Sequence, residues 1–243
     1  MNLVLFSHQA ESYSLPRSDR RHRHIRSILR ARVGDVLRAG VINGPVGEIL
    51  IEQLDDNEIV LAARWQGPAP PPAPVTVLLG HPRPPVLKRL WRDMASLGVE
   101  EIRVFSGDLG ERSYLTSSAW DDPDLYLQDG LSQGGHTVAP RLLRFARLDE
   151  ALEEDPDTPE EGRTLRLFGA LRSDDGFSLE EMLREVNRST SVRICVGPER
   201  GFADREETLL RGRGYRPVSL GQRILRTETA ATLLVGSVCS QEF

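Results

Sequence analysis

Cysteine and long hydrophobic runs are scarce in this 243-residue sequence. Its two cysteines, Cys195 and Cys239, lie among apolar residues without the spacing of a metal site, so we interpret them as buried thiols of a reducing compartment. No apolar run approaches the roughly 20 residues that cross a membrane. The N-terminal residues predict a strand and not a signal peptide. These absences predict a cytoplasmic protein with no membrane segment and no metal.

Several catalytic and nucleotide-binding motifs are also missing. No expected strand is followed by G-x-G-x-x-G, and Lys88, the one lysine, follows prolines and not the glycines of a Walker A loop. The G-x-S-x-G elbow of serine hydrolases is absent, and no group of histidines and cysteines has zinc-ligand spacing. These absences argue against metal-dependent hydrolysis and against acyl transfer.

The charge of the chain is unevenly distributed. Its net charge of −5 argues against a general coat for nucleic acid. Between Arg17 and Arg38, however, there are eight arginines and two acids, whereas Asp149–Glu161 contains eight acids and no basic residue. A basic segment inside an acidic protein predicts one local anionic partner. We interpret the acidic run as a solvated connection.

A proline-rich run, GPAPPPAP at 67–74, is the clearest break in composition. Five prolines in eight residues exclude a helix or a central strand and predict a semi-rigid spacer. We therefore predict a first domain over 1–67, a linker over 68–74 and a second domain over 75–243.

The first domain is predicted to be a small β-barrel. Short β-rich runs at 2–6, 35–41, 46–54 and 58–65 are separated by turn residues. One polar helix is expected at about 19–30. Short strands with a single helix are typical of a small barrel.

Strands and helices alternate in the second domain. Apolar stripes at helical spacing, Val86–Leu97 and Leu179–Val186, predict two helices, and Asp204 with Glu207 predicts a capping-box start for a third. The expected strands are at 75–80, 101–105, 164–170, 192–197 and 215–221. This alternation is typical of an α/β fold in which helices flank a parallel sheet.

Three expected strands end in loops that contain a glycine. They are LFGALRS, VGPERGF and LGQRILRTETA, with Gly169, Gly197 and Gly221. Ligands of open α/β sheets bind beyond the carboxyl ends of the strands, and glycine lets the backbone approach a ligand closely. One such glycine is most often a turn residue, but three at strand ends favour a ligand site.

The last two of these loops carry a family resemblance. VGPERGF and LGQRILRTETA resemble the paired signatures of the 16S ribosomal RNA uracil-N3 methyltransferase family, in the SPOUT class of α/β-knot methyltransferases. HIRSILRARVGDVLRAG resembles the family's helix and strand in a PUA-like barrel, and LKRLWRDMASLGVEEIRVF its first helix and second strand of the knot domain. The chain departs from the family at Arg200, at Ser96, in LSQGGHT (131–137) and in HPRPP (81–85).

The resemblance implies a C-terminal trefoil-knot domain that binds S-adenosyl-L-methionine, an N-terminal PUA-like RNA-binding domain, and a homodimer formed through the knot domain. It also implies that Ile224 and Leu225 line the adenine pocket and that backbone groups of Gly169, Gly197, Leu220 and Leu225 make its polar contacts. Simple core packing is the alternative for the apolar pair. The full set of implied cofactor-binding residues is Leu167, Gly169, Gly197, Pro198, Glu199, Gly201, Leu220, Gly221, Ile224, Leu225, Thr229 and Ala230.

Arg226 and Glu228 are the catalytic residues that this resemblance implies. Methylation of uracil at N3 needs loss of the imide proton, and a guanidinium stabilises the resulting anion or places the substrate. A carboxylate accepts the proton or orients the arginine. The alternative for Glu228 is an acid that interacts with the dipole of a helix N-terminus, and the alternative for Glu199 is a carboxylate that holds its loop together.

The resemblance makes 16S ribosomal RNA of the small subunit the expected anionic partner. Guanidinium groups contact phosphates and so orient an RNA. The candidates are Arg17, Arg20, Arg21, Arg23, Arg26 and Arg30; a solvated helix face is the alternative. Two other functions stay open: methylation of another ribosomal or transfer RNA nucleotide, and RNA binding or ribosome assembly without catalysis.

Overall fold

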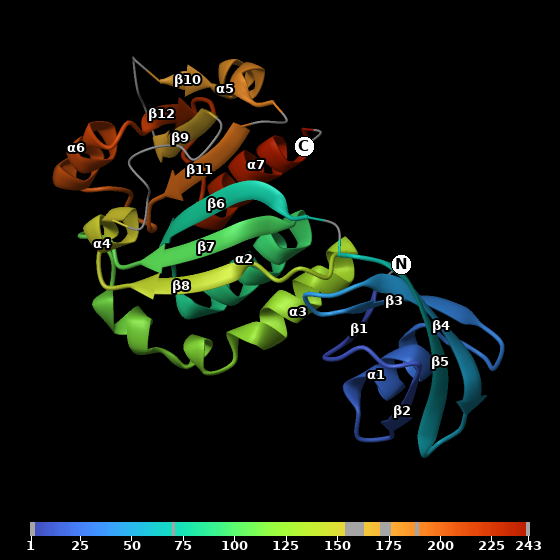
Figure 1. Cartoon of the computed structure of the whole chain (residues 1–243). Coiled ribbons are helices and arrows are strands. Elements are labelled where there is room, and N and C mark those ends of the chain that lie inside the picture. Colours follow the sequence, from blue (N-terminus) through green and yellow to red (C-terminus); the bar gives the residue numbers. More distant parts are fainter. Residues whose placement is uncertain (1–2, 70, 154–162, 171–175, 188–189, 242–243) are drawn as a thin grey trace. The chain divides into compact units, whose positions relative to one another are not determined.

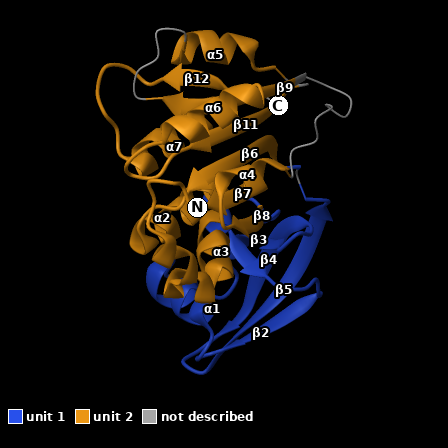
Figure 2. Cartoon of the chain, turned by 90° about the vertical axis from the view of Figure 1, so that its left-hand side faces the viewer, with its two compact units in different colours: residues 1–71, 131–139 blue, residues 72–130, 140–243 orange. Residues whose placement is uncertain are grey.

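The computed structural model describes residues 3–69, 71–153, 163–170, 176–187 and 190–241. The chain divides into two compact units (Figure 2). The first contains residues 1–71 and 131–139, and the second contains 72–130 and 140–243. No helix in the described ranges has the length and apolar character needed to span a membrane.

The first unit is a curled, mixed five-stranded sheet (Figure 1). The strand order is β1-β3-β4-β5-β2; β1 and β3 are parallel and the other pairs are antiparallel. The strands are β1 (Val4–Phe6), β2 (Ser12–Pro16), β3 (Val36–Val41), β4 (Val46–Leu54) and β5 (Glu58–Gly67). Alternate residues of β4, such as Ile49 and Ile51, are buried in the core, as expected for a strand with one solvated face.

The expected helix at 19–30 is shorter and less regular than an α-helix. It consists of α1 (Arg20–Arg23) and a π-helical turn, η1 (His24–Ile28). The Asp19 carboxylate accepts a hydrogen bond from the Arg21 N–H at 2.8 Å and caps α1. After the π-helical turn, Arg30 has a φ of +53°, the left-handed conformation that ends many helices.

A later segment, residues 131–139, completes the first unit. The Leu3 N–H donates to the Ser132 carbonyl at 2.8 Å, and the Ser132 hydroxyl donates to the Leu3 carbonyl at 2.6 Å. The Asn43 N–H donates to the Thr137 carbonyl at 2.7 Å. The linear domain boundaries expected from the sequence do not include this return of the chain.

The second unit is a seven-stranded sheet in which every described pair is parallel, with the order β10-β12-β9-β11-β6-β7-β8. Its strands are β6 (Ala73–Gly80), β7 (Val99–Phe105), β8 (Arg141–Phe145), β9 (Arg163–Ala170), β10 (Phe177–Ser178), β11 (Thr190–Val196) and β12 (Arg216–Ser219). The helices are α2 (Pro84–Leu97), α3 (Pro123–Gly134), α4 (Leu148–Glu153), α5 (Leu179–Glu185), α6 (Asp204–Gly212) and α7 (Thr227–Cys239), with 3-10 turns η2 (Arg112–Thr116) and η3 (Ser118–Asp121). The predicted class, an α/β parallel sheet with a small β-rich N-terminal unit, is confirmed.

Three local predictions are corrected. Strand β6, a central strand, includes Pro74, which lies where the register between β6 and β7 shifts, so the proline removes no regular ladder bond. The acidic run begins as helix α4, since Leu148, Ala151 and Leu152 are buried; its residues 154–161 lie outside the described part of the chain. Helix α6 is capped by Glu206 and not by the expected pair, because the Glu206 carboxylate accepts the Ala203 N–H at 2.9 Å.

The C-terminal helix returns to the middle of the second sheet. Helix α7 packs against α2, β6 and β11. The strand before it, β12, lies between β9 and β10, toward one side of the sheet. Between β12 and α7 the chain therefore crosses from that side of the sheet to its centre. This crossing brings the LGQRILRTETA loop next to the VGPERGF loop, and Thr227 of the former bonds to Gly197 of the latter.

Candidate active site

The site lies at the carboxyl ends of the parallel strands of the second unit. Gly80 at the end of β6 pairs with Phe105 at the end of β7, and Cys195 of β11 pairs with Leu78 of β6 and with Phe168 of β9. Since parallel strands end at the same edge of a sheet, the loops that follow β6, β7, β11 and β12 meet there.

The VGPERGF loop is packed tightly against the ends of β6 and β7. A β-carbon at Gly80 would overlap the Pro198 ring, and one at Gly107 would lie 3.0 Å from Pro198 Cγ. Gly201 has a φ of +75°, and its N–H donates to the Pro198 carbonyl at 2.8 Å. The two glycines form a cradle for Pro198, and the third closes the turn.

Two carboxylates hold this loop in place. The Glu199 Oε1 atom accepts the Arg83 N–H at 2.9 Å. Buried Glu206 accepts the Asp108 N–H at 3.0 Å in addition to that of Ala203. These contacts support the loop-holding alternative for Glu199, because its carboxylate joins the loop after β11 to the loop after β6.

The LGQRILRTETA loop is open by comparison. Gly221 has a φ of +101°, which favours glycine, and the Ile224 side chain is 80% exposed. Core packing is therefore wrong for Ile224, while Leu225 and Leu220 are half-buried. An exposed isoleucine beside a backbone turn fits a small-molecule site, which combines apolar walls with a few polar groups.

Thr227 links the two loops. It is buried at the start of α7, and its hydroxyl donates to the Gly197 carbonyl at 3.3 Å. Thr227 was not among the expected site residues, although its position inside the LGQRILRTETA motif could have indicated it.

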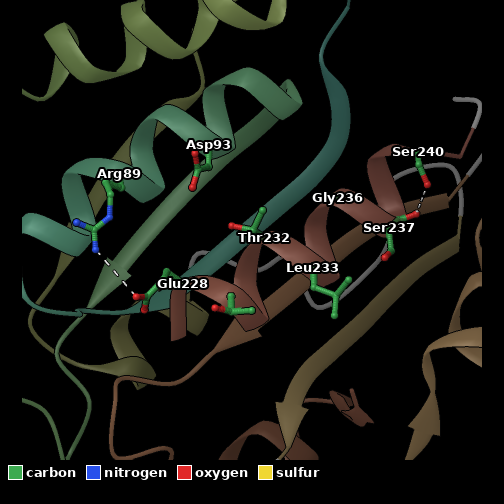
Figure 3. A pocket seen from close by; sticks show the side chains of 9 residues that line it. Arg89, Asp93, Glu228, Thr232, Leu233, Gly236, Ser237 and Ser240 are labelled. Carbon is green, nitrogen blue, oxygen red and sulfur yellow. Dashed lines mark hydrogen bonds and ion pairs between the residues drawn. The ribbon is translucent and has the colours of Figure 1, made fainter. Parts of the chain in front are cut away.

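The two expected catalytic side chains point to different surroundings. Arg226 is the exposed N-cap residue of α7, and its guanidinium has no salt-bridge partner among the described residues. The Glu228 carboxylate lies 4.0 Å from the Arg89 guanidinium in a groove between α2 and α7, as Figure 3 shows. This position supports the alternative for Glu228, an acid in the first turn of a helix.

The groove between α2 and α7 has a volume of about 610 Å³. Its lining residues are Arg89, Asp93, Glu228, Thr229, Thr232, Leu233, Gly236, Ser237 and Ser240. Burial raises the pKa of Asp93. Thr229, an expected cofactor contact, belongs to this groove.

The other expected cofactor contacts lie on the strands and on α7. Leu167 is buried within β9, and Gly169 pairs with Val218 of β12. A β-carbon at Gly169 would lie 3.5 Å from Leu234 Cδ1, so the packing of the protein alone does not require glycine there. The Ala230 N–H is occupied within α7, where it donates to the Arg226 carbonyl at 2.9 Å.

The six candidate RNA-binding arginines differ in their contacts. Arg21 is engaged inside the unit: its guanidinium forms hydrogen bonds with Asp19 and with the Leu5 carbonyl and lies 4.9 Å from the centroid of the Phe6 ring. Arg26 is paired with Asp56. Arg20 also has an interaction. Five of the six candidates are exposed: Arg17, Arg20, Arg23, Arg26 and Arg30.

The cysteines and other metal-binding side chains do not form a cluster. In the described ranges, no group of three or more His, Cys, Asp or Glu side chains is arranged to hold a metal. Cys195 is fully buried as predicted, and Cys239 is partly exposed. Burial raises the pKa of the Cys239 thiol to about 11, so at neutral pH it stays protonated.

Comparison with known proteins places this site in a family. Residues 69–239 match the family model of the RNA methyltransferase domain. The chain is 30% identical over 237 residues to ribosomal RNA small subunit methyltransferase E of Treponema pallidum, covering 95% of this chain and 88% of the relative. It is 28% identical to ribosomal RNA small subunit methyltransferase E 1 of Borreliella burgdorferi, covering 95% and 94%.

A solved structure has the same fold. It is ribosomal RNA small subunit methyltransferase E from Neisseria gonorrhoeae bound to S-adenosyl methionine, with a TM-score of 0.76, 19% identity, and coverage of 98% of this chain and 96% of that one. Because the family model spans most of the sequence and includes both motif loops, this chain belongs to the RNA methyltransferase family.

Proposed function

We propose that the protein is an S-adenosyl-L-methionine-dependent methyltransferase that forms N3-methyluridine in 16S ribosomal RNA of the small subunit. The observation that carries this proposal is the junction of VGPERGF and LGQRILRTETA at one sheet edge, joined by the Thr227–Gly197 hydrogen bond, in a chain of the RNA methyltransferase family. Two relatives are named as methyltransferases of the small-subunit ribosomal RNA, and these names support the choice of substrate.

The residues at this edge fit the proposed cofactor. Bound S-adenosyl-L-methionine supplies a methyl group activated by its sulfonium charge. Exposed Ile224 and half-buried Leu225 provide apolar walls for its adenine, and Gly169, which has no side chain, lets a ligand approach the backbone closely. The Pro198 cradle fixes the facing loop, so the site is largely formed before a ligand binds.

Arg226 is the residue proposed to act on the substrate base. Methylation of uracil at N3 requires loss of the N3 proton, which leaves negative charge on N3 and on the flanking carbonyl oxygens until the methyl group is transferred. The exposed Arg226 guanidinium at the N-cap of α7 stabilises that charge. Glu228 stays a prediction as proton acceptor, and its position beside Arg89 favours a role in fixing the start of α7.

The five exposed candidates of the first unit, Arg17, Arg20, Arg23, Arg26 and Arg30, are proposed to contact phosphates of the RNA. Phosphate contacts orient a substrate and weaken as salt rises. A cytoplasmic location is part of the same proposal, since ribosomal RNA is the substrate.

The groove between α2 and α7 is proposed as the homodimer interface of the second unit. Leu233 is 41% exposed on α7, among small side chains such as Gly236 and Ser237. Small residues let two helices approach closely, and an exposed leucine gains from burial. Sedimentation velocity should show a dimer that the variant Leu233→Glu converts to monomer, and a monomeric parent protein would contradict this interface.

The test of the function is methylation of unmodified small ribosomal subunits with radiolabelled S-adenosyl-L-methionine, followed by chromatography and mass spectrometry of the labelled nucleosides. Label in N3-methyluridine supports reaction and substrate together. Label in another nucleoside retains the enzyme class and changes the target. If the protein neither binds the cofactor nor transfers a methyl group, the proposal fails and a binding role remains.

A further inference from the structure

Aromatic side chains gather beside the VGPERGF loop, in a region that the proposed mechanism does not use. His81 follows β6, and its ring centroid lies 5.7 Å from that of Tyr114 in η2 and 5.9 Å from that of Trp120 in η3. Trp91 of α2 packs edge-on against Trp120 with centroids 5.0 Å apart. Trp91 and His81 are buried, whereas Tyr114 and Trp120 are partly exposed.

His81 holds the Trp120 indole in one orientation. The His81 Nδ1 atom lies 2.7 Å from the Pro82 carbonyl oxygen, so Nδ1 carries the hydrogen and donates it. Nε2 is then an acceptor, and it receives the Trp120 Nε1–H at 3.0 Å. Burial lowers the pKa of His81, which maintains this neutral form.

A guanidinium lies over the outer part of this cluster. The Arg144 Cζ atom is 5.0 Å from the centroid of the Trp120 ring, and Arg144 Nη1 donates to the Leu115 carbonyl at 2.8 Å. Arg144 is exposed. Its hydrogen bond to Leu115 holds the guanidinium over one face of the indole, so the outer side of the guanidinium and the exposed part of the ring form one preformed surface.

This surface lies near the proposed methyl-transfer site. His81 directly follows Gly80, which packs against Pro198 of the VGPERGF loop, and the His81 ring contacts Trp120. The backbone N–H of His81 donates to the Phe105 carbonyl at 2.7 Å. Ser106, which directly follows Phe105, is buried, and its hydroxyl has no hydrogen-bond partner among the described residues. Buried hydroxyl groups usually have a hydrogen-bond partner, so a ligand that binds here could supply one.

We propose that Trp120 and Arg144 form a stacking platform for a base of the RNA substrate, with His81 as the positioning residue of the indole. This inference rests on the proposed function for the identity of the RNA. Unpaired bases are recognised by stacking on aromatic rings and on guanidinium planes. A solvated ring–cation pair at the rim of an RNA-modifying site has the chemistry for this contact.

Tryptophan fluorescence tests the platform without any methyl transfer. A Trp65→Phe variant retains buried Trp91 and half-buried Trp120, and is titrated with an unmodified 16S ribosomal RNA transcript while binding is followed by filter retention. We expect the transcript to quench the emission, and expect the added change Trp120→Phe to abolish the quenching because Trp91 is fully buried. Bound RNA without quenching, or quenching that persists without Trp120, would overturn the proposal.

Kinetics provide the second measurement. Trp120→Leu should raise the KM for RNA about tenfold, as expected for loss of one stacked base, with kcat and cofactor affinity within about twofold. Arg144→Ala should have a smaller effect of the same kind. The matched control is Arg184→Ala, an exposed arginine paired with Glu180 on α5, and we expect it to leave all three quantities unchanged.

His81 is tested through its acceptor atom. His81→Phe should change the wavelength of the Trp120 emission, because the indole N–H loses its acceptor, and should raise the KM for RNA. His81→Gln, which supplies an acceptor, should restore both in part. If the parent protein methylates RNA and Trp120→Leu has the parent KM, the platform is wrong and the proposed function stands. Quenching by RNA without any methylation would instead retain the platform and reject the function.

Discussion

The two motif loops of the second unit lie at the same sheet edge and differ in burial and in the contacts that hold them. Gly197 and Pro198 of the VGPERGF loop are buried, and this loop is held by glycine cradles and by hydrogen bonds to Glu199 and Glu206. Residues 221–224 of the other loop are exposed. The first motif therefore includes residues that pack against the protein itself, whereas the second motif begins with residues that the protein leaves exposed.

Arg226→Ala should produce the largest effect and should act on catalysis alone. Loss of one group that stabilises a developing anion lowers kcat by roughly 10²- to 10³-fold. Because Arg226 is exposed, the free energy of unfolding should not change, and cofactor affinity should stay within a few-fold. Single-turnover methylation, calorimetric cofactor binding and urea unfolding measure the three quantities. Parent-like turnover would remove Arg226 from the mechanism.

Gly80→Ala should act on the packed loop through stability. A β-carbon at this position overlaps Pro198, and overpacking of this kind costs about 1–3 kcal/mol of the free energy of unfolding. Gly212→Ala is the control, because a β-carbon there meets no atom within 4 Å. Urea unfolding of both variants decides the matter, and equal stability would mean that the cradle tolerates a side chain.

Ile224→Ser should act on the open loop through ligand affinity. The side chain is 80% exposed, so the free energy of unfolding should stay within about 0.5 kcal/mol of the parent value. Cofactor affinity should fall by roughly tenfold, as expected when one apolar side chain is removed from a binding pocket. Isothermal titration calorimetry tests this. An unchanged affinity would place the adenine elsewhere.

Thr227→Val should have the smallest effect, because it removes one hydrogen bond between the two loops. The change keeps the shape of the side chain and leaves the Gly197 carbonyl without the hydroxyl that donates to it at 3.3 Å. We expect a loss of about 1 kcal/mol in stability together with weaker cofactor binding. Thr227→Ser, which retains the hydroxyl, should restore affinity, and if it does not, the link has no role in binding.

Elements with strong local patterns were predicted from the sequence. Strands such as β4 and β11 are continuous or alternating apolar runs, and helix α2 carries an apolar stripe that is buried in the structure. Strands β2, β8 and β10 were missed because they are short and rich in polar or charged residues. Their pairing depends on neighbouring strands and not on local composition.

Contacts between distant residues were beyond the sequence pattern. Helix α6 is capped by the Glu206 carboxylate, which accepts the Ala203 N–H, whereas the sequence predicted a capping box formed by Asp204 and Glu207. The return of residues 131–139 to the first unit depends on hydrogen bonds with Leu3 and Asn43. The expected site residues were chosen from the motifs and stay a prediction. The different surroundings of Arg226 and Glu228 could not be predicted, because they depend on the packing of α2 against α7.

The return of α7 to the middle of the sheet has a consequence for biosynthesis. A chain is made from its N-terminus, and its domains tend to fold in that order. Here β6 is made early in its unit, whereas α7, which packs beside it, is made after every described strand of the sheet. A nascent chain that has been made only as far as β12 therefore contains every described strand of the sheet and lacks the helix that packs on β6 and β11, so synthesis of α7 is needed before the middle of the sheet is covered.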